Sequence, residues 1–322
     1  MTRNDREMTL RFMAAPTDVA TIGGGVRGGR ILEWVDKAAY ACAAAWSGGY
    51  SVTAYVGNIS FGRDIESGDI VEVTATLVHT GRTSMHIECS VASADPRVGT
   101  FTEASRCLLV FVSVDEEGTP TPVRQWEPVW AADVARSDAA CARTEVRNRI
   151  TAAMSDADYS GTSAALNVST RFLAAPTDVN WGGKAHGGRV MGWIDDAAYL
   201  CAVRWWSGEA VTVYMGGVRF YRPIHIGQVV EVQARLIHTG RQTMHVAVHV
   251  YAHWPREGRE TRRLAAHSLT VLAALDVNGD ATDVKPWTPQ LPKDIALDLH
   301  ARDLITIRGK RRPAREHRMV EI

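Results

Sequence analysis

The chain is poor in cysteine, has no net charge and contains no long apolar run. Its 322 residues include five cysteines, none in a CxxC pair, which disfavours a disulfide framework and a thiolate metal site. Lysine plus arginine and aspartate plus glutamate both number 36, so no global field recruits nucleic acid or an anionic membrane. No predominantly apolar segment approaches the roughly 18 residues of a membrane span. The opening MTRNDREMTL also lacks the apolar segment of a signal peptide. We therefore expect a soluble, cytoplasmic protein with reduced cysteines.

Two further absences narrow the kind of site. Neither glycine cluster follows a strand in a βαβ unit, which disfavours a dinucleotide site. His79 and His238 lie in matched HTGR turns, and we interpret neither as a metal ligand. We expect no metal.

The chain does contain a copy of itself. RFMAAPTDV at Arg11 returns as RFLAAPTDV 160 residues later, and HTGRTSMH at His79 returns as HTGRQTMH 159 residues later. This period is too long for solenoid or propeller repeats and suits two complete domains. We expect one domain over 8–127, a helical tail and exposed linker over 128–165, a second domain over 166–290, and a helical, basic tail over 291–322.

A glycine cluster leads into an apolar periodic segment in each repeat. The clusters are GGGVRGG at 23–29 and GGKAHGG at 182–188, and each is followed by apolar residues at steps of three and four. This period predicts one long, buried helix per repeat. Each helix should end at a Ser-Gly pair, at 47–48 and at 207–208, because glycine commonly follows the last helical residue.

Beyond each helix the apolar period becomes two. It predicts strands near 51–60, 69–79, 83–93 and 101–113, with counterparts about 160 residues later. Short turns join successive strands, which favours an antiparallel meander. Each repeat is therefore expected to be one helix packed on one antiparallel sheet, an α+β fold.

Three segments of the second repeat resemble the acyl-CoA thioesterase branch of the hotdog superfamily. They are NWGGKAHGGRVMGWIDDAA from Asn180, VRFYRPIHIGQVVEV from Val218 and HTGRQTMHV from His238. The chain is most similar to cytosolic acyl-CoA hydrolases, including those with two hotdog domains in tandem. The resemblance covers nearly the whole chain except the linker and the tail. It implies a double hotdog that hydrolyses acyl-CoA to a free acid and coenzyme A at composite sites between paired domains. It also implies no cofactor beyond the coenzyme A of substrate and product, and a homo-oligomer, a trimer of double hotdogs or a dimer.

An aspartate lies about two turns into each predicted helix. Asp36 and Asp195 share the face of the glycines but sit roughly 10 Å along the axis from their own helix start. Two antiparallel helices would instead bring each carboxylate to the partner's glycine loop. The resemblance implies that Asn180 and a helix aspartate form the catalytic pair. The aspartate would be the base or nucleophile, and the N–H groups near Gly187 and Gly188 would stabilise the oxyanion.

The two repeats differ in the loop before the helix. Asn180 aligns with Ala20, and His186 aligns with Arg27. If the sites are composite, Asn180 works with Asp36, whereas Asp195 faces a loop without an amide. We therefore predict one competent and one degenerate site per chain. His186 is a candidate substrate-binding residue or base, with a loop or capping role as the alternative.

Polar residues in matched turns are candidates for the coenzyme A surface, because guanidinium and hydroxyl groups bind phosphate and pantetheine oxygens. They are Arg82, Thr83, Ser84, Arg241, Gln242 and Thr243, with Arg63 and Arg222 as weaker candidates.

Two other functions stay open at this point. A hotdog dehydratase or hydratase would act on enoyl or hydroxyacyl thioesters, and a module with decayed sites would bind acyl-CoA without turnover. The sequence does not specify the length of the acyl chain.

Overall fold

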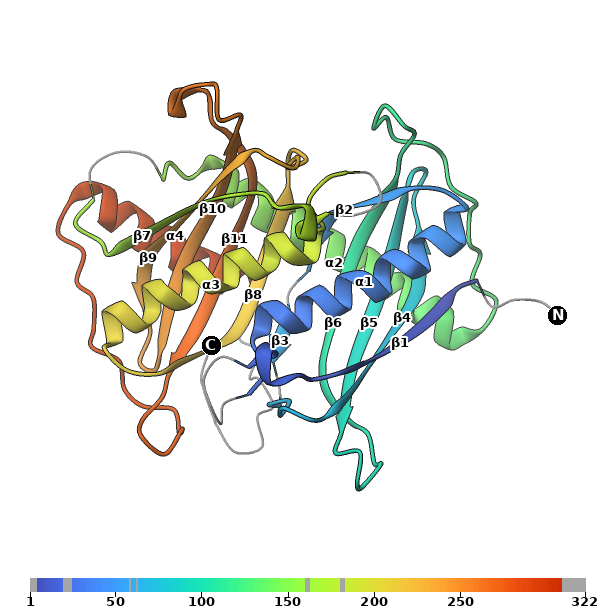
Figure 1. Cartoon of the computed structure of the whole chain (residues 1–322), viewed down its shortest axis with the longest axis horizontal. Helices are drawn as coiled ribbons and strands as arrows, with labels where there is room; N and C mark the ends of the chain where they lie inside the picture. The colour runs from blue at the N-terminus through green and yellow to red at the C-terminus, as the bar shows by residue number, and fades with distance from the viewer. Residues whose placement is uncertain are drawn as a thin grey trace. The chain divides into compact units, whose positions relative to one another are not determined.

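The computed structural model describes residues 5–19, 25–57, 59–61, 63–159, 163–179 and 183–308. The chain divides into two compact units (Figure 1). Unit 1 is Met1–Ile59, Arg63–Glu145 and Gly187–Gly192, and unit 2 is Ser60–Gly62, Val146–His186 and Trp193–Ile322. Six residues of the second repeat's helix therefore belong to the unit built mainly by the first repeat.

Unit 1 has one long helix, α1 (Gly28–Ser47), packed on an antiparallel sheet (Figure 1). The strand order in this sheet is β1-β4-β5-β6-β2. The strands are β1 (Glu7–Met13), β2 (Ser51–Val56), β4 (Ile70–Thr80), β5 (Ser84–Ala94) and β6 (Thr102–Ser113), with a short β3 (Ile59–Phe61) after β2. The predicted meander is confirmed. Sequence analysis missed β1, although Met8, Leu10 and Phe12 alternate with polar residues there.

Unit 2 repeats this arrangement around most of α3 (Gly187–Trp206). Its sheet has the order β8-β11-β10-β9-β7. The strands are β7 (Asn167–Leu173), β8 (Ala210–Phe220), β9 (Val229–Thr239), β10 (Thr243–His253) and β11 (Arg263–Ala274). The α+β fold with one helix and one antiparallel sheet per repeat is confirmed.

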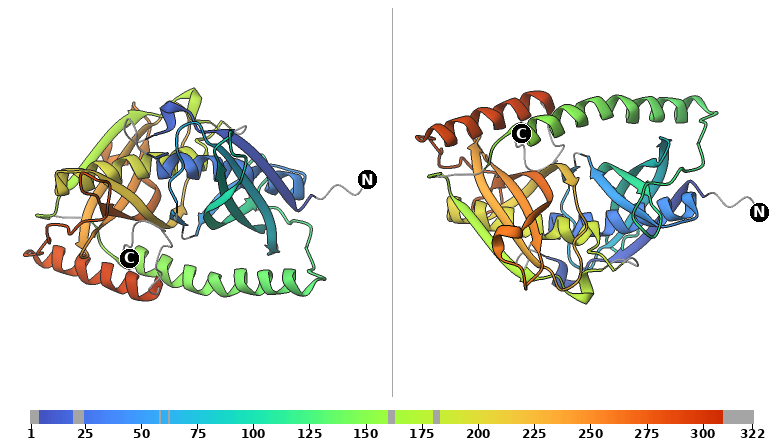
Figure 2. Two further views of the ribbon diagram at one scale, coloured as in Figure 1. Left: turned by 90° about the horizontal axis from the view of Figure 1, so that it is seen from below. Right: turned by 90° about the horizontal axis from the view of Figure 1, so that it is seen from above.

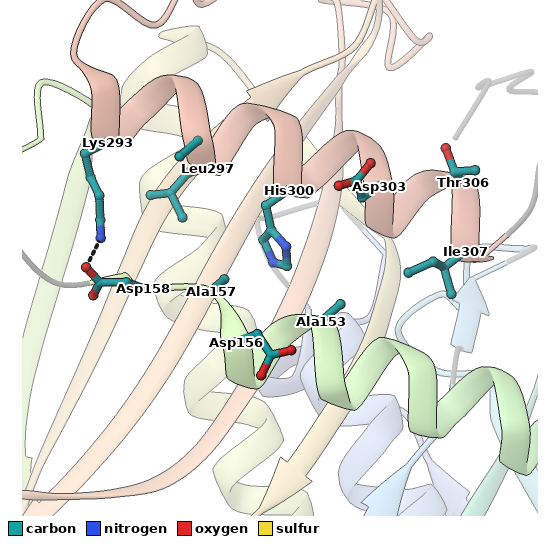
Figure 3. A pocket seen from close by; sticks show the side chains of 11 residues that line it. Ala153, Asp156, Ala157, Asp158, Lys293, Leu297, His300, Asp303, Thr306 and Ile307 are labelled. Atoms are coloured by element: carbon teal, nitrogen blue, oxygen red, sulfur yellow. Dashed lines mark ion pairs between the residues drawn. The ribbon is translucent and has the colours of Figure 1, made fainter.

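Two polar helices follow the repeats, α2 (Ala131–Asp156) and α4 (Pro292–Arg308). In unit 2, α4 covers the face of the sheet opposite α3 (Figure 2). The expectation of an exposed linker is wrong for the last turns of α2, because Ile150 and Met154 are buried against Leu269 of the sheet and Leu297 of α4. Between the end of α2 and α4 lies a groove of about 610 Å³, where Lys293 pairs with Asp158 (Figure 3).

The helix ends follow the prediction in one repeat and depart from it in the other. Gly48 caps α1 in the left-handed conformation, with φ of 69°, and donates its N–H to Ala44 O at 2.9 Å. In the second repeat α3 ends one residue earlier, and Ser207 takes the left-handed conformation with φ of 60°. Serine tolerates this region less well than glycine, because its Cβ crowds the backbone.

Unit 2 buries histidines on the sheet face that carries α4. His249 packs on Tyr159 with ring centroids 4.4 Å apart, and His267 accepts or donates a hydrogen bond with Tyr221 Oη at 3.1 Å. Burial lowers the pKa of His249 to about 3 and that of His267 to about 4.

Stability should therefore fall in mild acid. The unfolded chain protonates histidine near pH 6.5, whereas the folded chain keeps His249 and His267 neutral. Between pH 6.5 and about 4, the unfolded state binds more protons, so lowering the pH favours unfolding by about 2 kcal/mol per histidine at pH 5. We expect a lower urea midpoint at pH 5 than at pH 7, and a smaller difference in His249→Gln. An unchanged difference in this variant would contradict the assignment.

Within the described residues, no helix is long and apolar enough to span a bilayer.

Candidate active site

An aspartate anchors the loop before each long helix. The carboxylate of Asp18 accepts the N–H of Ala15 at 2.8 Å, and its backbone oxygen accepts the N–H of Arg27 at 3.0 Å. Asp178 does the same in the second repeat, accepting the N–H groups of Ala175 at 2.9 Å and His186 at 2.8 Å. In each repeat, the aspartate of the APTD sequence thus links the segment just after the preceding strand to the residue just before the first glycine of the helix.

Asp36 is the centre of the site in unit 1. Its side chain is buried, and both carboxylate oxygens accept hydrogen bonds. The Thr53 hydroxyl donates to Oδ1 at 2.7 Å, and the Gly188 N–H donates to Oδ2 at 2.8 Å. Together, a strand hydroxyl and a helix-start amide fix the orientation of the carboxylate.

The backbone of α3 approaches α1 so closely here that glycine is required. A Cβ on Gly188 would lie 2.6 Å from Glu33 Cα, and a Cβ on Gly187 would lie 2.9 Å from Thr53 Oγ1 and 3.1 Å from Asp36 Oδ2. Real Cβ atoms do not tolerate a backbone atom at 2.6 Å. The glycine pair is therefore a condition for the bond between Gly188 and Asp36.

The structure separates the roles of the two glycines. The Gly188 N–H, expected as an oxyanion donor, is hydrogen-bonded to Asp36. Among the described residues, the Gly187 N–H has no hydrogen-bond partner. An amide at the first position of a helix has no partner within the helix and is favoured by the dipole for binding negative charge. The Gly187 N–H is the better-placed donor for an oxygen that gains charge.

Glu33 adds a second buried carboxylate beside this site. It accepts hydrogen bonds from Lys37 at 2.9 Å and from Arg30 at 2.7 Å, and Arg189 lies 3.9 Å away. Burial alone would raise the pKa of Glu33, but the bonds from Lys37 and Arg30 hold it below the ordinary value. Glu33 is therefore an ionised, paired carboxylate.

In unit 2, Asp195 has a matching environment. It is buried, and the Thr212 hydroxyl donates to its Oδ1 at 2.7 Å. Sequence analysis missed both threonines. The signal was present, because Thr53 and Thr212 each follow the helix aspartate by 17 residues in matching VTAY and VTVY segments.

Loss of the Thr53 hydroxyl should impair turnover more than folding. In Thr53→Val, Oδ1 of Asp36 loses a neutral donor while the side chain keeps its volume. A bond to a charged group contributes about 1.5–3 kcal/mol, so we expect kcat to fall by about tenfold or more. The matched control is Thr212→Val, for which we expect turnover near that of the wild type. Equal losses in the two variants would contradict a special role for the Asp36 side.

The remaining candidates are distributed unevenly. Asn180 and its counterpart Ala20 lie outside the described residues. His186 directly precedes α3 and is half-buried, with its N–H bonded to Asp178 O. Arg63 and Arg222 lie in exposed loops next to Ile65 and Ile224, whose carbonyls accept N–H groups from the loops that lead into the helices.

The HTGR turns lie at the other end of each helix. Val123 donates its N–H to Arg82 O at 3.0 Å, and Trp46, near the end of α1, donates Nε1–H to Arg124 O at 2.9 Å. In unit 2, Val284 likewise donates its N–H to Arg241 O, at 2.8 Å. Since a helix of 20 residues is about 30 Å long, the turns are far from the glycine start in their own repeat. Their six polar residues, whose role on the coenzyme A surface stays a prediction, are Arg82, Thr83, Ser84, Arg241, Gln242 and Thr243.

Thiol and metal chemistry find little support within the described residues. Four of the five cysteines are buried, and burial raises the pKa of Cys42, Cys107 and Cys201 to about 12. His245 and His249 stand four residues apart, a spacing that sequence analysis overlooked. They lie on a strand, and no group of three or more potential ligands is arranged to hold a metal ion in the part of the chain that the structure describes.

The fold and the Asp36 site define a protein with two tandem hotdog domains, each a long helix on an antiparallel sheet. A family model described as the thioesterase superfamily matches residues 23–100 and 182–258. The acyl-CoA thioester hydrolase YkhA of Bacillus subtilis, named as uncharacterized, is 34% identical over 38% of this chain and 70% of that protein. The cytosolic acyl coenzyme A thioester hydrolase of Rattus norvegicus is 22% identical over 85% of this chain and 76% of that protein. This chain belongs to the thioesterase superfamily, as the resemblance implied.

A solved structure supports the tandem arrangement at the level of the fold. The crystal structure of a protein described as an oleoyl thioesterase from Lactobacillus plantarum covers 85% of this chain and 98% of its own, with a TM-score of 0.57 and 10% identity.

Proposed function

We propose that this protein hydrolyses acyl-CoA to a free carboxylic acid and coenzyme A. The observation that carries the proposal is the buried Asp36 carboxylate, oriented by the Thr53 hydroxyl and the Gly188 N–H beside a helix start with an unpaired amide. The relatives that span most of this chain include proteins named as acyl-CoA thioester hydrolases. An oriented carboxylate and a helix-start N–H are the two elements that thioester hydrolysis needs.

The reaction begins with attack on the thioester carbonyl. With Asp36 as general base, water forms the new C–O bond and gives its proton to the carboxylate. The Gly187 N–H donates to the carbonyl oxygen as it becomes negative. The tetrahedral intermediate then expels the sulfur, which takes a proton and leaves as the thiol of coenzyme A. With Asp36 as nucleophile, an acyl-enzyme anhydride forms first, and water hydrolyses it.

The active site is proposed to be composite. Asp36 and Thr53 come from the first repeat, whereas the glycine start comes from the second, and Gly187–Gly192 group with unit 1. Asn180 lies seven residues before Gly187 in the same repeat and would position water or the carbonyl. Asp195 would pair with the loop that carries Ala20, so we propose one competent site per chain.

The rest of the assignment follows from this chemistry. The reaction needs no cofactor besides the coenzyme A of the substrate, and no metal. Assembly of further copies into a trimer or dimer and a cytoplasmic location stay predictions.

Thiol release from a panel of acyl-CoAs, from short to long and including an aryl member, tests the proposed function. We expect release of free coenzyme A from at least one member. Binding of acyl-CoA without release would favour a non-catalytic module. Conversion of enoyl or hydroxyacyl chains without thiol release would favour a dehydratase or hydratase.

A further inference from the structure

A pocket of about 330 Å³ opens at the end of the unit-2 sheet where the loop between β8 and β9 meets the connection between β10 and β11. Its walls include Arg222, His225, Trp254 and Arg263. Trp254 is 44% exposed and stacks on His225, with ring centroids 6.2 Å apart and planes 25° apart. The pocket thus presents an aromatic surface that is supported on one side and open to solvent.

Two cations at this pocket have no carboxylate partner among the described residues. Arg222 makes no ion pair there, and Arg263 donates only to the backbone oxygens of Thr261 and Arg262. The acidic residue in the lining, Glu257, accepts the Thr261 hydroxyl at 3.2 Å. Guanidinium groups without carboxylate partners are suited to phosphate oxygens, and an exposed indole face is suited to a planar base.

The first repeat has the same backbone frame with different side-chain chemistry. Val26 donates its N–H to Ile65 O at 2.8 Å, as Ala185 donates to Ile224 O at 2.7 Å. Among the positions of the pocket that change between the repeats, Pro223, His225, Gln228 and Trp254 correspond to Asp64, Glu66, Asp69 and Asp95, and Glu257 corresponds to Val98, whereas Arg222 is retained as Arg63. The duplicated frame therefore carries an exposed indole in repeat 2 and more carboxylates in repeat 1.

The pocket adjoins the chain that leads to the active site. Lys184 forms an isolated β-bridge with His225, and Ala185 is bonded to Ile224. Gly187 lies three positions after Lys184 in the chain, a span of at most about 10 Å. The repeat that has this pocket is also the repeat that has Asn180.

We propose that this pocket binds the adenine nucleotide end of coenzyme A, with the base against Trp254 and the phosphates on Arg222 and Arg263. The inference rests on the proposed hydrolysis of acyl-CoA. The pantetheine arm would follow the chain at Lys184 and Ala185 toward the start of α3. The counterpart in repeat 1 has Asp95, paired with Arg97, in place of the indole, so stacking of the base and the amide of Asn180 both favour a single competent site.

The test compares acyl-CoA with the acyl-pantetheine of the same acyl group, which lacks the nucleotide. Trp254→Asp gives the pocket the residue that repeat 1 has, Arg222→Ala removes one cation, and Asp95→Ala is the matched control in repeat 1. Loss of one stacking contact raises KM by about tenfold. We expect this increase for acyl-CoA in Trp254→Asp and Arg222→Ala, with kcat unchanged. We also expect no change for acyl-pantetheine, and none for either substrate in Asp95→Ala.

Several outcomes would overturn the assignment or support it. Equal losses with both thioesters would show a structural defect, and unchanged KM values would show that the pocket does not touch the substrate. Binding of ATP at Trp254 without competition from acyl-CoA would assign the pocket to a free nucleotide instead. If the wild type hydrolyses neither thioester, the proposed function fails. Calorimetry with adenosine 3′,5′-bisphosphate then tests the pocket by itself, and binding that is lost in Trp254→Asp would uphold its nucleotide chemistry.

Discussion

Asp36→Asn should abolish most thiol release while leaving the fold intact. Asparagine keeps the size of the side chain and can still accept the Thr53 hydroxyl or the Gly188 N–H, which are 2.7 and 2.8 Å from the carboxylate. It has no basic oxygen and cannot attack a thioester carbonyl. General base catalysis by a positioned side chain contributes about 10²–10⁴-fold, so kcat should fall by at least about a hundredfold. The measurement is steady-state thiol release, with a thermal unfolding curve to verify folding.

Asp195→Asn is the matched control for this prediction. It makes the same change in the second repeat, where the Thr212 hydroxyl donates to the carboxylate at 2.7 Å. We expect it to keep most of the turnover, because its proposed partner loop carries Ala20 in place of an asparagine. The reverse result, with Asp195→Asn inactive and Asp36→Asn active, would refute the pairing of Asp36 with the second repeat's loop.

Much of the fold could be predicted from the sequence because local patterns determine it. The change of apolar period from 3.6 to two located α1, β2, β4, β5 and β6, and the duplication placed their counterparts in the second repeat, although α3 ends one residue earlier than predicted. The patterns failed for segments whose structure or burial depends on tertiary contacts. The segment of β1 is short and half-exposed, and α4 has a polar sequence but buries Leu297 against the sheet.

The site was predictable only in part for the same reason. Asp36 lies at a helical spacing from the glycines before it, and both features recur in the second repeat. The sequence alone therefore identifies these residues as candidates. The role of Thr53 depends on the packing of β2 against α1, which no period reports. The two glycine amides looked equivalent in the sequence, and only the geometry distinguishes the Gly188 N–H, bonded to Asp36, from the Gly187 N–H.

Gly188→Ala should be among the most damaging single-methyl additions in the chain. The new Cβ would meet Glu33 Cα at 2.6 Å and Asp36 Cβ at 3.3 Å. Backbone atoms of a helix cannot rotate away as a flexible side chain can, so α3 must shift from α1. The shift would break the bond between the Gly188 N–H and Asp36 and displace the Gly187 N–H from the carbonyl oxygen. Since a misplacement of about 1 Å costs roughly a hundredfold, we expect kcat to fall by about that factor.

The same helix offers a control for this substitution. A Cβ on Gly192, four residues further along α3, would meet nothing within 4 Å. Gly192→Ala should keep full activity and stabilise the helix by up to about 1 kcal/mol, because alanine loses less backbone entropy than glycine. Turnover and the thermal midpoint are measured for both variants. A loss in Gly188→Ala alone would be due to the close backbone approach at that residue, whereas a loss in both would mean that α3 tolerates no added methyl group. Full activity in Gly188→Ala would mean that the approach of α3 to Glu33 is not required, and the Gly188 N–H would then have no role in holding Asp36 for catalysis.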